Sequence, residues 1–340
     1  MRFALDVMGG DHAPHEILKG AFMSLDLLAP DDELVLVGDE QAITQDMKDN
    51  GIDDARLSIV ASSDDIRMDD PPIDSVRAKP NSSIVKMARM AGRKAENPVD
   101  IIISAGNTGA CVSAAQMHLR RLPGVHRPGI AVCLPTFGGP VVICDIGANP
   151  DPKAHHLWQY GIMAAAYCRE MFGVENPTIA QLNIGGEEMK GTDIVRGARE
   201  YFQQTEGVNY IGYIEGREMF DHVADVVVTD GFVGNVVIKL SEGLASGIFK
   251  SISHEIGKQS ADLVDAFKPV IKSIYARHDY HEQGGAPLLG VNGTCIICHG
   301  SSEAYTISSA IRNSRILVKN KLNEGIVSRL ATVNQQVGAG

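Results

Sequence analysis

The stretch that decides the fold is Asp225 to Gly243, DVVVTDGFVGNVVIKLSEG. It opens with DVVV, a short β-branched run typical of a strand that is buried on both faces of a sheet. The apolar residues that follow lie three or four positions apart: Val233, Val236, Val237 and Leu240. Such spacing indicates a helix. Because Thr229-Asp230-Gly231 separates the two patterns, the stretch predicts a strand, a tight turn and a helix.

Polar groups gather where this helix begins. Asp230, Asn235 and Lys239 bring a carboxylate, an amide and an ammonium to one helix N-terminus. Gly231 and Gly234 would let backbone N–H groups approach a ligand closely. We therefore expect a site for an anion together with proton chemistry, with Asp230, Asn235 and Lys239 as its catalytic candidates. An ordinary strand-to-helix turn with glycines for steric reasons is the alternative.

Four other segments repeat this pattern, in which an apolar run meets Gly, Asn, Asp or Thr and then a helical spacing. They are Phe3 to Pro14 (FALDVMGGDHAP), Ile101 to Ala110 (IIISAGNTGA), Val141 to Pro150 (VVICDIGANP) and Ile179 to Gly191 (IAQLNIGGEEMKG). In an open parallel sheet the turns that follow the strands lie along one edge, where ligands bind. We expect one large α/β domain over residues 1–340, with these five turns along one edge of a mostly parallel sheet.

Composition narrows the class of protein. The chain has 340 residues, of which 44% are hydrophobic and 21% charged, as in ordinary globular proteins. Its net charge of −11 argues against a nucleic-acid partner. Six cysteines, several of them inside apolar runs, suggest reduced thiols in the cytosol. The N-terminus lacks the apolar run of a signal peptide, so we expect a cytoplasmic protein.

A second candidate site is Ala78 to Ile84, AKPNSSI. Ser82 is a suitable cap for a helix predicted from about Ser83 to Glu96, and Lys79 lies just before it. A lysine beside a Ser-Ser helix start suits phosphate, while plain capping with a solvated lysine is the alternative. Asn107 and Thr108 open the helix after the next strand. Neither titrates near neutrality, so they would bind and orient.

Three patterns that suggest metal or haem chemistry are interpreted structurally. They are the acidic loop Ser62 to Pro72, the adjacent pair His155-His156, and Cys295-x-x-Cys298-His299. The loop lacks the fixed Gly and Glu positions of a calcium site, and adjacent histidines point to different faces of a helix. The cysteines fall in a predicted hairpin, with strands around Leu288 to Val291 and Thr294 to His299 joined by Asn292-Gly293. We expect neither a metal nor a cofactor.

From Ser241 to Arg277 the helical spacing persists far longer than in the other helices. Lysines and one arginine accompany its apolar stripe: Lys250, Lys258, Lys268, Lys272 and Arg277. A helical excursion over residues 241–280 is therefore expected to protrude from the domain. It would pack against a partner subunit or the core, and in addition it would be able to rest on anionic lipid.

Five motifs in order give the chain a resemblance to the PlsX family, the acyl-carrier-protein-dependent phosphate acyltransferases of bacterial phospholipid synthesis. They are DVMGGDHAP at Asp6 to Pro14, SAGNTGA at Ser104 to Ala110, DIGAN at Asp145 to Asn149, TDGFVGNVVIKLSEG at Thr229 to Gly243, and GGAPLLGVNG at Gly284 to Gly293. The resemblance spans nearly the whole chain. Val7 stands where alanine would be expected, a change that affects no chemical group.

The resemblance implies a three-layer α/β/α sandwich similar to isocitrate and isopropylmalate dehydrogenases. It also implies transfer of a fatty acyl group from acyl carrier protein to inorganic phosphate, which supplies acyl phosphate to a membrane glycerol-3-phosphate acyltransferase. A cytoplasmic, loosely membrane-associated homodimer is expected. From the motifs and turns together, the substrate-binding candidates are Gly9, Gly10, Asp11, Lys79, Ser82, Ser83, Gly106, Asn107, Thr108, Gly109, Asn149, Gly231, Gly284 and Gly285.

Phosphate is already an anionic nucleophile, so this reaction needs no activated Ser, Cys or Lys. The hypothesis is that Lys79, Ser82 and Ser83 hold phosphate, that Asn107, Thr108 and Asn235 orient oxygen atoms, and that Asp230 moves a proton. Lys239 is a secondary electrostatic candidate. An acidic carrier protein calls for a basic face, for which two sets are equally suitable. They are Arg89, Arg93 and Lys94, or Arg312, Arg315 and Lys319.

Two other functions stay open at the level of sequence. One is a nicotinamide-dependent decarboxylating dehydrogenase of the related fold, with Arg120, Arg121 and Arg127 clamping a polycarboxylate. The other is a non-catalytic scaffold that binds the carrier protein at the membrane. Five polar turns are more than a scaffold requires.

Overall fold

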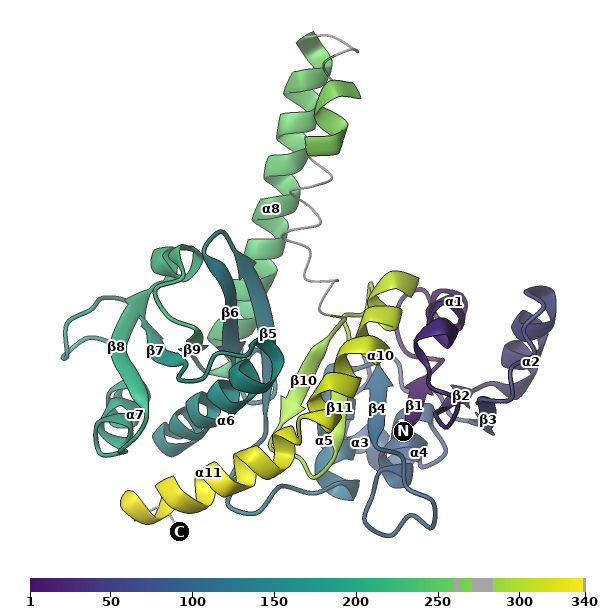
Figure 1. Ribbon diagram of the computed structural model, residues 1–340, viewed down its shortest axis with the longest axis horizontal. Coiled ribbons are helices and arrows are strands. Elements are labelled where there is room, and N and C mark those ends of the chain that lie inside the picture. Colours follow the sequence, from purple (N-terminus) through teal and green to yellow (C-terminus); the bar gives the residue numbers. More distant parts are fainter. Residues whose placement is uncertain (260–262, 264, 271–283, 339–340) are drawn as a thin grey trace.

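A computed structural model describes residues 1–259, 263, 265–270 and 284–338, and one 11-stranded sheet runs through it (Figure 1). From one edge to the other the strands are β3 (Leu57–Ala61), β2 (Glu33–Gly38), β1 (Arg2–Asp6), β4 (Ile101–Ser104), β11 (Thr294–Ile297), β10 (Ala286–Leu289), β5 (Gly129–Thr136), β6 (Gly139–Cys144), β9 (Val226–Val228), β7 (Thr178–Asn183) and β8 (Asn209–Glu215). Helices cover both faces of this sheet, which confirms the predicted three-layer α/β/α class.

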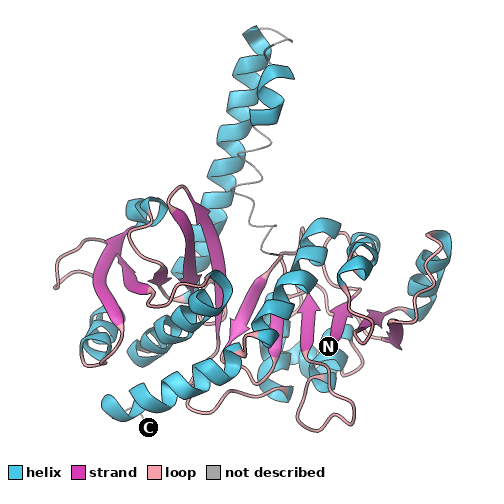
Figure 2. Cartoon of the chain, in the orientation of Figure 1, coloured by secondary structure: helices cyan, strands magenta, loops and turns pink. Residues whose placement is uncertain are grey.

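The pairing of the strands divides the sheet into two parallel halves that run in opposite directions. Figure 2 shows the strands in magenta with the helices packed against them. In the first half β3, β2, β1, β4 and β11 are parallel, and in the second β6, β9, β7 and β8 are parallel. Between them lie three antiparallel contacts: β11 with β10, β10 with β5, and β5 with β6. Because three is an odd number, the second half points the opposite way to the first.

The helices are sorted between the faces by their apolar residues. One face packs against a core formed with α1 (His15–Met23), α2 (Glu40–Asp49), α6 (Ala154–Phe172), α7 (Asp193–Gln203), α10 (Ala304–Lys319) and α11 (Leu322–Gln336). On the other face, the first half of the sheet is covered by α3 (Pro72–Ala78), α4 (Ser83–Met90) and α5 (Thr108–His118). The second half of that face packs against Val237 and Ile238 of α8 (Gly231–Gln259). The described residues also include two short 3₁₀ helices, η1 (Leu25–Leu27) and η2 (Gly216–Asp221).

The strand, turn and helix predicted for Asp225 to Gly243 are confirmed. Val226, Val227 and Val228 of β9 are fully buried, and the strand pairs with β6 on one side and β7 on the other. Asp230 ends the turn because its carboxylate accepts a hydrogen bond from the Val233 N–H at 2.8 Å, which caps the start of α8.

Helix α8 is a single helix of 29 residues that projects away from the α/β body (Figure 1). By length and composition alone, Gly231–Lys258 would suffice to cross a membrane, and 6% of its most apolar window is buried. The predicted excursion over residues 241–280 therefore begins inside a helix that already starts at Gly231. Residues 260–262, 264 and 271–280 of that excursion, with Lys272 and Arg277, lie outside the described residues.

Several boundaries differ from the sequence-based expectation. Helix α4 ends at Met90 and not near Glu96, because Gly92 follows and the chain turns there. Helices α3 and α11 had not been predicted. The predicted hairpin, β10 with β11, is present, and β5 with β6 forms another.

Candidate functional site

The polar turns form two groups, at opposite ends of the strands. The first turn cluster comprises Asp6–Asp11 and Ser104–Gly109, which follow β1 and β4. The second turn cluster comprises Asp145–Asn149 and Thr229–Gly234, which follow β6 and β9. The expectation that all these turns share one edge is wrong, because the three antiparallel contacts reverse the second half of the sheet. The turn after β7 falls at the end that carries the second cluster.

A buried carboxyl lies at the centre of the first turn cluster. Asp6 ends β1 with 1% of its surface exposed, and Ser104 Oγ donates to Asp6 Oδ2 at 2.7 Å. The Gly106 N–H in turn donates to Ser104 Oγ at 3.0 Å. Burial raises the pKa of Asp6, and hydrogen bonds from Ser83 and Ser104 offset part of that rise. Asp6 thus ties the two turns together, although sequence reasoning had not singled it out.

Asn107 is the cap of α5 and an anchor for a neighbouring loop. Its Oδ1 accepts from the Ala110 N–H at 3.0 Å. Its Nδ2 donates to the carbonyls of Arg67, Met68 and Asp70 at 3.1, 3.2 and 3.1 Å. Both ends of the amide are therefore occupied by the protein. Thr108 and Gly109, the first residues of α5, are half-buried beside it.

The predicted phosphate residues near α4 also have protein partners. Lys79 Nζ pairs with Asp70 Oδ2 at 2.5 Å and donates to the Asp65 carbonyl at 2.6 Å. Ser82 is fully buried and accepts from the Val85 N–H at 3.4 Å, so its predicted capping role is confirmed. Ser83 is 5% exposed. The hydrogen bond from Lys79 lowers the pKa of Asp70. Lys79 is thus ion-paired, not solvated as the alternative interpretation had it.

The glycines of the first motif and the last motif approach other backbone closely. At Gly9 an added Cβ would lie 2.6 Å from the Gly106 nitrogen, and at Gly284 it would lie 2.1 Å from the Ala310 nitrogen. Gly10 and Gly285 are half-buried. The neighbouring Asp11 N–H donates to the Gly300 carbonyl at 2.7 Å, and the Asp11 side chain is exposed. Gly9 and Gly284 therefore serve close packing, whereas solvent reaches Asp11.

A second buried carboxylate, Asp145, organises the second turn cluster. It is fully buried, and its Oδ1 accepts N–H bonds from Ile130 at 2.9 Å, Ala148 at 3.0 Å and Gly147 at 3.2 Å. Its Oδ2 accepts from the Asn149 N–H at 2.7 Å. Burial raises the pKa of Asp145, and these N–H donors lower it in part. Sequence reasoning had also missed this residue.

The catalytic candidates of the opening stretch lie along the first part of α8: Asp230 directly before it, and Asn235 and Lys239 on its second and third turns. The Gly231 N–H donates to the Asn149 carbonyl at 2.9 Å, which joins the two turns of the second cluster. Asn149 Nδ2 donates to the Pro128 carbonyl at 2.7 Å. Asp230 is half-buried, while Asn235 and Lys239 are exposed one turn apart on α8. The structure thus brings Asn149, Asp230 and Gly231 together, at the opposite strand ends from Asn107.

The thiols offer no nucleophile. All six cysteines are buried and free: Cys111, Cys133, Cys144, Cys168, Cys295 and Cys298. Burial raises the pKa of Cys111, Cys133, Cys168 and Cys298 to about 12, and raises those of Cys144 and Cys295 well above the ordinary range. Across the described ranges, no group of three or more His, Cys, Asp or Glu side chains is arranged to hold a metal ion.

Comparison with known proteins identifies the family. A family model described as "Fatty acid synthesis protein" matches residues 1–324. Two relatives named phosphate acyltransferase, from Pelotomaculum thermopropionicum and Desulfitobacterium hafniense, are 41% and 42% identical over 342 and 333 residues. These alignments cover 100% and 97% of this chain, and 98% of each relative.

The chain belongs to the PlsX family of phosphate acyltransferases. It is accordingly a transferase enzyme. Among solved structures, it is similar to a phosphotransacetylase from Streptococcus pyogenes, with a TM-score of 0.62 and 15% identity over 94% of each chain. EutD phosphotransacetylase from Staphylococcus aureus gives a TM-score of 0.55 with 14% identity, over 93% of this chain and 94% of that one. At such identities these structures support the fold of the phosphate acyltransferase and nothing more.

Membership in the phosphate acyltransferase family also decides between the functions left open by the sequence. The relatives are acyltransferases, so neither a dehydrogenase nor a scaffold is needed to account for the polar turns. The arginines proposed to clamp a polycarboxylate lie around the end of α5 and the segment before β5. There Arg121 donates to the carbonyl of His126.

Proposed function

We propose that the enzyme transfers a fatty acyl group from the thioester of acyl carrier protein to inorganic phosphate, giving acyl phosphate. The observation that carries this proposal is the near full-length match to phosphate acyltransferases. The burial of every cysteine further supports direct attack by phosphate, without an acyl-cysteine intermediate. A phosphate oxygen forms the new bond to the acyl carbon, the carbon–sulfur bond breaks, and the proton of hydrogen phosphate ends on the released thiol.

For the chemistry itself we propose the second turn cluster. Asp230 is half-buried, and the N-terminus of α8 beside it favours an anion. Asn235 and Lys239 are the exposed amide and ammonium that follow on the same helix. In this arrangement Lys239 and Asn235 stabilise phosphate and the oxyanion, and Asp230 carries the proton from phosphate to the leaving sulfur.

For the first turn cluster, and for Lys79, Ser82 and Ser83 at the start of α4, we propose a binding role away from the reacting atoms. Ser82 and Ser83 are buried, and Lys79 and Asn107 already have protein partners, so these four hold the turn in shape. Solvent reaches Gly10, Asp11 and Thr108 at least in part. A long acyl substrate would be able to contact both clusters, whereas one phosphate ion contacts one.

The activity is tested by incubating the purified enzyme with acyl carrier thioester, with and without phosphate. We expect free thiol and acyl phosphate to appear in equal amounts and only when phosphate is present. Thiol is measured with a chromogenic disulfide, and acyl phosphate is trapped as the hydroxamate. Sulfate replaces phosphate in the control. Thiol release without phosphate, or an acyl group found on the protein by mass spectrometry, would contradict the proposal.

We further propose that the described part of α8 packs against a second copy of the chain. Its exposed apolar residues recur every four positions: Leu240, Leu244, Ile248 and Ile252, which are 66%, 60%, 48% and 41% exposed. Residues four apart lie on one side of a helix, so these form a stripe. An apolar stripe on a helix that leaves the body of the protein is the kind of surface that an identical helix covers.

The double variant Leu240→Glu/Leu244→Glu is expected to dissociate the homodimer. Losing about 1 kcal/mol at each of four half-exposed sites, two per copy, weakens dimerisation on the order of 1,000-fold. Sedimentation velocity over a range of concentrations measures the change. Ala245→Glu is the matched control, because it adds a charge about 100° around the helix from Leu244. A monomeric parent enzyme, or a variant as dimeric as the parent, would refute the interface.

Membrane association is a further part of the proposal. The helical residues 265–270, which come after α8 in the chain, include the exposed apolar side chains Phe267 and Val270, at 40% and 49% exposed. Two of the lysines expected to meet anionic lipid have acidic neighbours, since Lys258 pairs with Glu255 and Lys268 with Asp265. Apolar contact therefore contributes more to membrane binding than the lysine charges do. A cytoplasmic enzyme held loosely at the membrane would release acyl phosphate close to a membrane glycerol-3-phosphate acyltransferase.

A further inference from the structure

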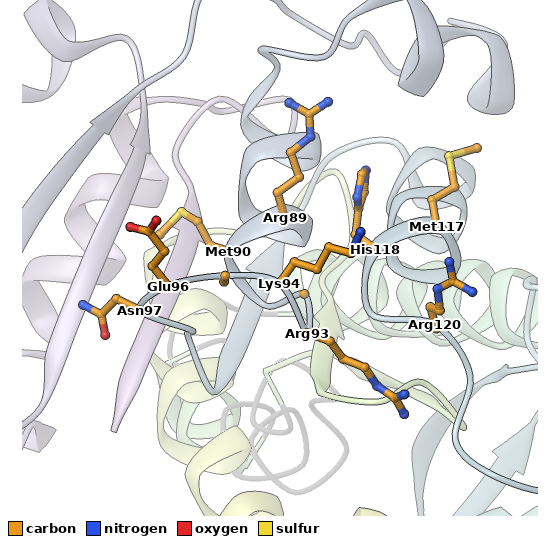
Figure 3. Close-up of a pocket in the computed structure, with 11 residues that line it drawn as sticks. Arg89, Met90, Arg93, Lys94, Glu96, Asn97, Met117, His118 and Arg120 are labelled. Atoms are coloured by element: carbon orange, nitrogen blue, oxygen red, sulfur yellow. The ribbon is translucent and has the colours of Figure 1, made fainter.

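A basic cavity of about 940 Å³ lies where α4 and α5 end (Figure 3). Four cations line it, Arg89, Arg93, Lys94 and Arg120, together with His118. Met90 and Met117 supply apolar surface, and Glu96 is the one acidic residue among the lining side chains. In a protein with a net charge of −11, such a concentration of positive charge stands out.

Most of this positive charge has no partner within the protein. Arg89 donates to the Pro80 carbonyl at 3.1 Å. In the part of the chain that the structure describes, no carboxylate lies within 4.0 Å of Arg93, Lys94 or Arg120. Cations are favoured at the C-terminus of a helix, which accounts for Arg89 in the last turn of α4. Arg93 and Lys94 lie beyond that end, so the helix alone does not explain them.

The backbone of Arg120 gives an independent observation. It is left-handed, with φ of 66°, at the position just after the cap of α5 where glycine is usual. This conformation is unfavourable for a residue with a side chain. The Arg120 N–H donates to the Ala115 carbonyl at 3.1 Å, and its carbonyl accepts from the Asn292 N–H at 2.9 Å. A glycine would make the same bonds without strain, so the guanidinium in the cavity is the feature that distinguishes arginine here.

The cavity lies at the end of the sheet that carries the second turn cluster. A neighbouring hollow of about 580 Å³ shares Met117 and Arg120 with it and extends to Val125. A few residues further on, the Pro128 carbonyl accepts from Asn149, and the Ile130 N–H donates to Asp145. The segment 120–130 therefore connects the basic cavity directly with the proposed reaction centre.

We propose that this basic cavity is where an acidic carrier protein docks to deliver its acyl thioester. The proposal rests on the function proposed above. Charge complementarity selects the partner: unpaired cations, with Met90 and Met117 among the lining residues, suit an acidic amphipathic helix. The other basic set is less available, because Arg315 pairs with Asp32 and lies 5.6 Å over the Phe3 ring. The carrier's prosthetic arm would then follow the segment 120–130 to Asp230.

The variant Arg93→Glu/Lys94→Glu tests the docking surface. We expect kcat/KM for acyl carrier protein to fall by about 100-fold, since two attractive charges become repulsive. The same acyl group on a small pantetheine thioester is expected to react as it does with the parent enzyme. Lys48→Glu/Lys319→Glu is the matched control, because it changes the net charge equally at exposed positions and includes one member of the other basic set. We expect it to alter neither rate by more than about threefold.

Direct binding gives a second measurement that needs no turnover. Anisotropy of a labelled acyl carrier protein should show weaker binding to Arg93→Glu/Lys94→Glu and to Arg120→Gly. Thermal unfolding should occur at a higher temperature in Arg120→Gly, because glycine removes the left-handed strain. A merely structural Arg120 would instead lower the unfolding temperature and leave binding unchanged.

The outcomes separate the two proposals. Unchanged binding and unchanged kcat/KM in the double variant would overturn the docking site and leave the acyltransferase function standing. An equal loss with the carrier protein and the small thioester would also overturn it, since the variant would then affect the reaction centre. A parent enzyme that makes no acyl phosphate from either thioester would overturn both.

Discussion

Replacing Asp230 with asparagine is expected to lower kcat by at least about 100-fold while leaving the fold intact. Positioned proton transfer contributes on the order of 100-fold or more, and an amide cannot take the proton from phosphate. The structural role of Asp230 survives, because asparagine caps a helix about as well as aspartate does. Its side-chain oxygen would still accept the 2.8 Å hydrogen bond from the Val233 N–H.

The matched control is Asp39→Asn, the same change at the cap of α2. Asp39 accepts from the Ala42 N–H at 2.9 Å, as Asp230 does from Val233, but it lies outside both turn clusters. Steady-state assays with acyl carrier thioester and phosphate, together with thermal unfolding, measure both variants. If Asp230→Asn retains full acyl phosphate production, Asp230 moves no proton and serves α8 alone.

The opening stretch shows what local sequence predicts well. The β-branched run at Val226 to Val228 has neighbours on both sides and no exposed surface, as its composition indicated. The turn follows from Asp230, whose carboxylate ends the strand pattern and caps the helix. Residue composition, hydrophobic periodicity and helix capping all depend on neighbouring residues. One short stretch of sequence is therefore enough to predict a strand, a turn and the start of a helix.

The direction of the second half of the sheet could not be predicted in the same way. Each hairpin reverses the chain between neighbouring segments, and the one joined by Asn292-Gly293 was expected. The third antiparallel contact joins Gly129 and Ile130 to Leu289 and Leu288, which are more than 150 positions away in sequence. No local pattern specifies that pairing. With only the two hairpins as antiparallel contacts, the two halves of the sheet would run in the same direction. The five turns would then have fallen on one edge, as expected.

The roles of individual polar residues in the candidate site also could not be predicted from the sequence. Asn107, Ser82 and Asp230 were selected for their polar groups, and all three are helix caps in the structure. The same chemistry that binds anions also satisfies free N–H groups at a helix start, so sequence alone does not separate the two roles. Asp6 and Asp145 were missed for the opposite reason. Each lies within a quoted motif, but only burial reveals that a carboxyl at a strand end holds two segments together.

Gly234→Ala is expected to destabilise the protein by about 3 kcal/mol or more and to displace the second turn cluster. An added Cβ would lie 2.0 Å from the Asp145 carbonyl oxygen, and its next neighbours, at 3.0 and 3.1 Å, are also backbone atoms. Backbone cannot swing aside as the tip of a side chain does, so α8 must shift outward. The turn that holds Asn149 and Gly231 would move with it, and kcat should fall.

Gly247→Ala on the same helix is the matched control, with an effect of opposite sign. No atom lies within 4 Å of the position that its Cβ would take, so alanine adds helix propensity without a clash. A gain of up to about 1 kcal/mol is expected. Denaturant unfolding followed by the fluorescence of the single, fully buried Trp158 compares both variants with the parent. Equal stabilisation by the two alanines would mean that α8 does not press on Asp145, and the link between this helix and the proposed reaction centre would fail.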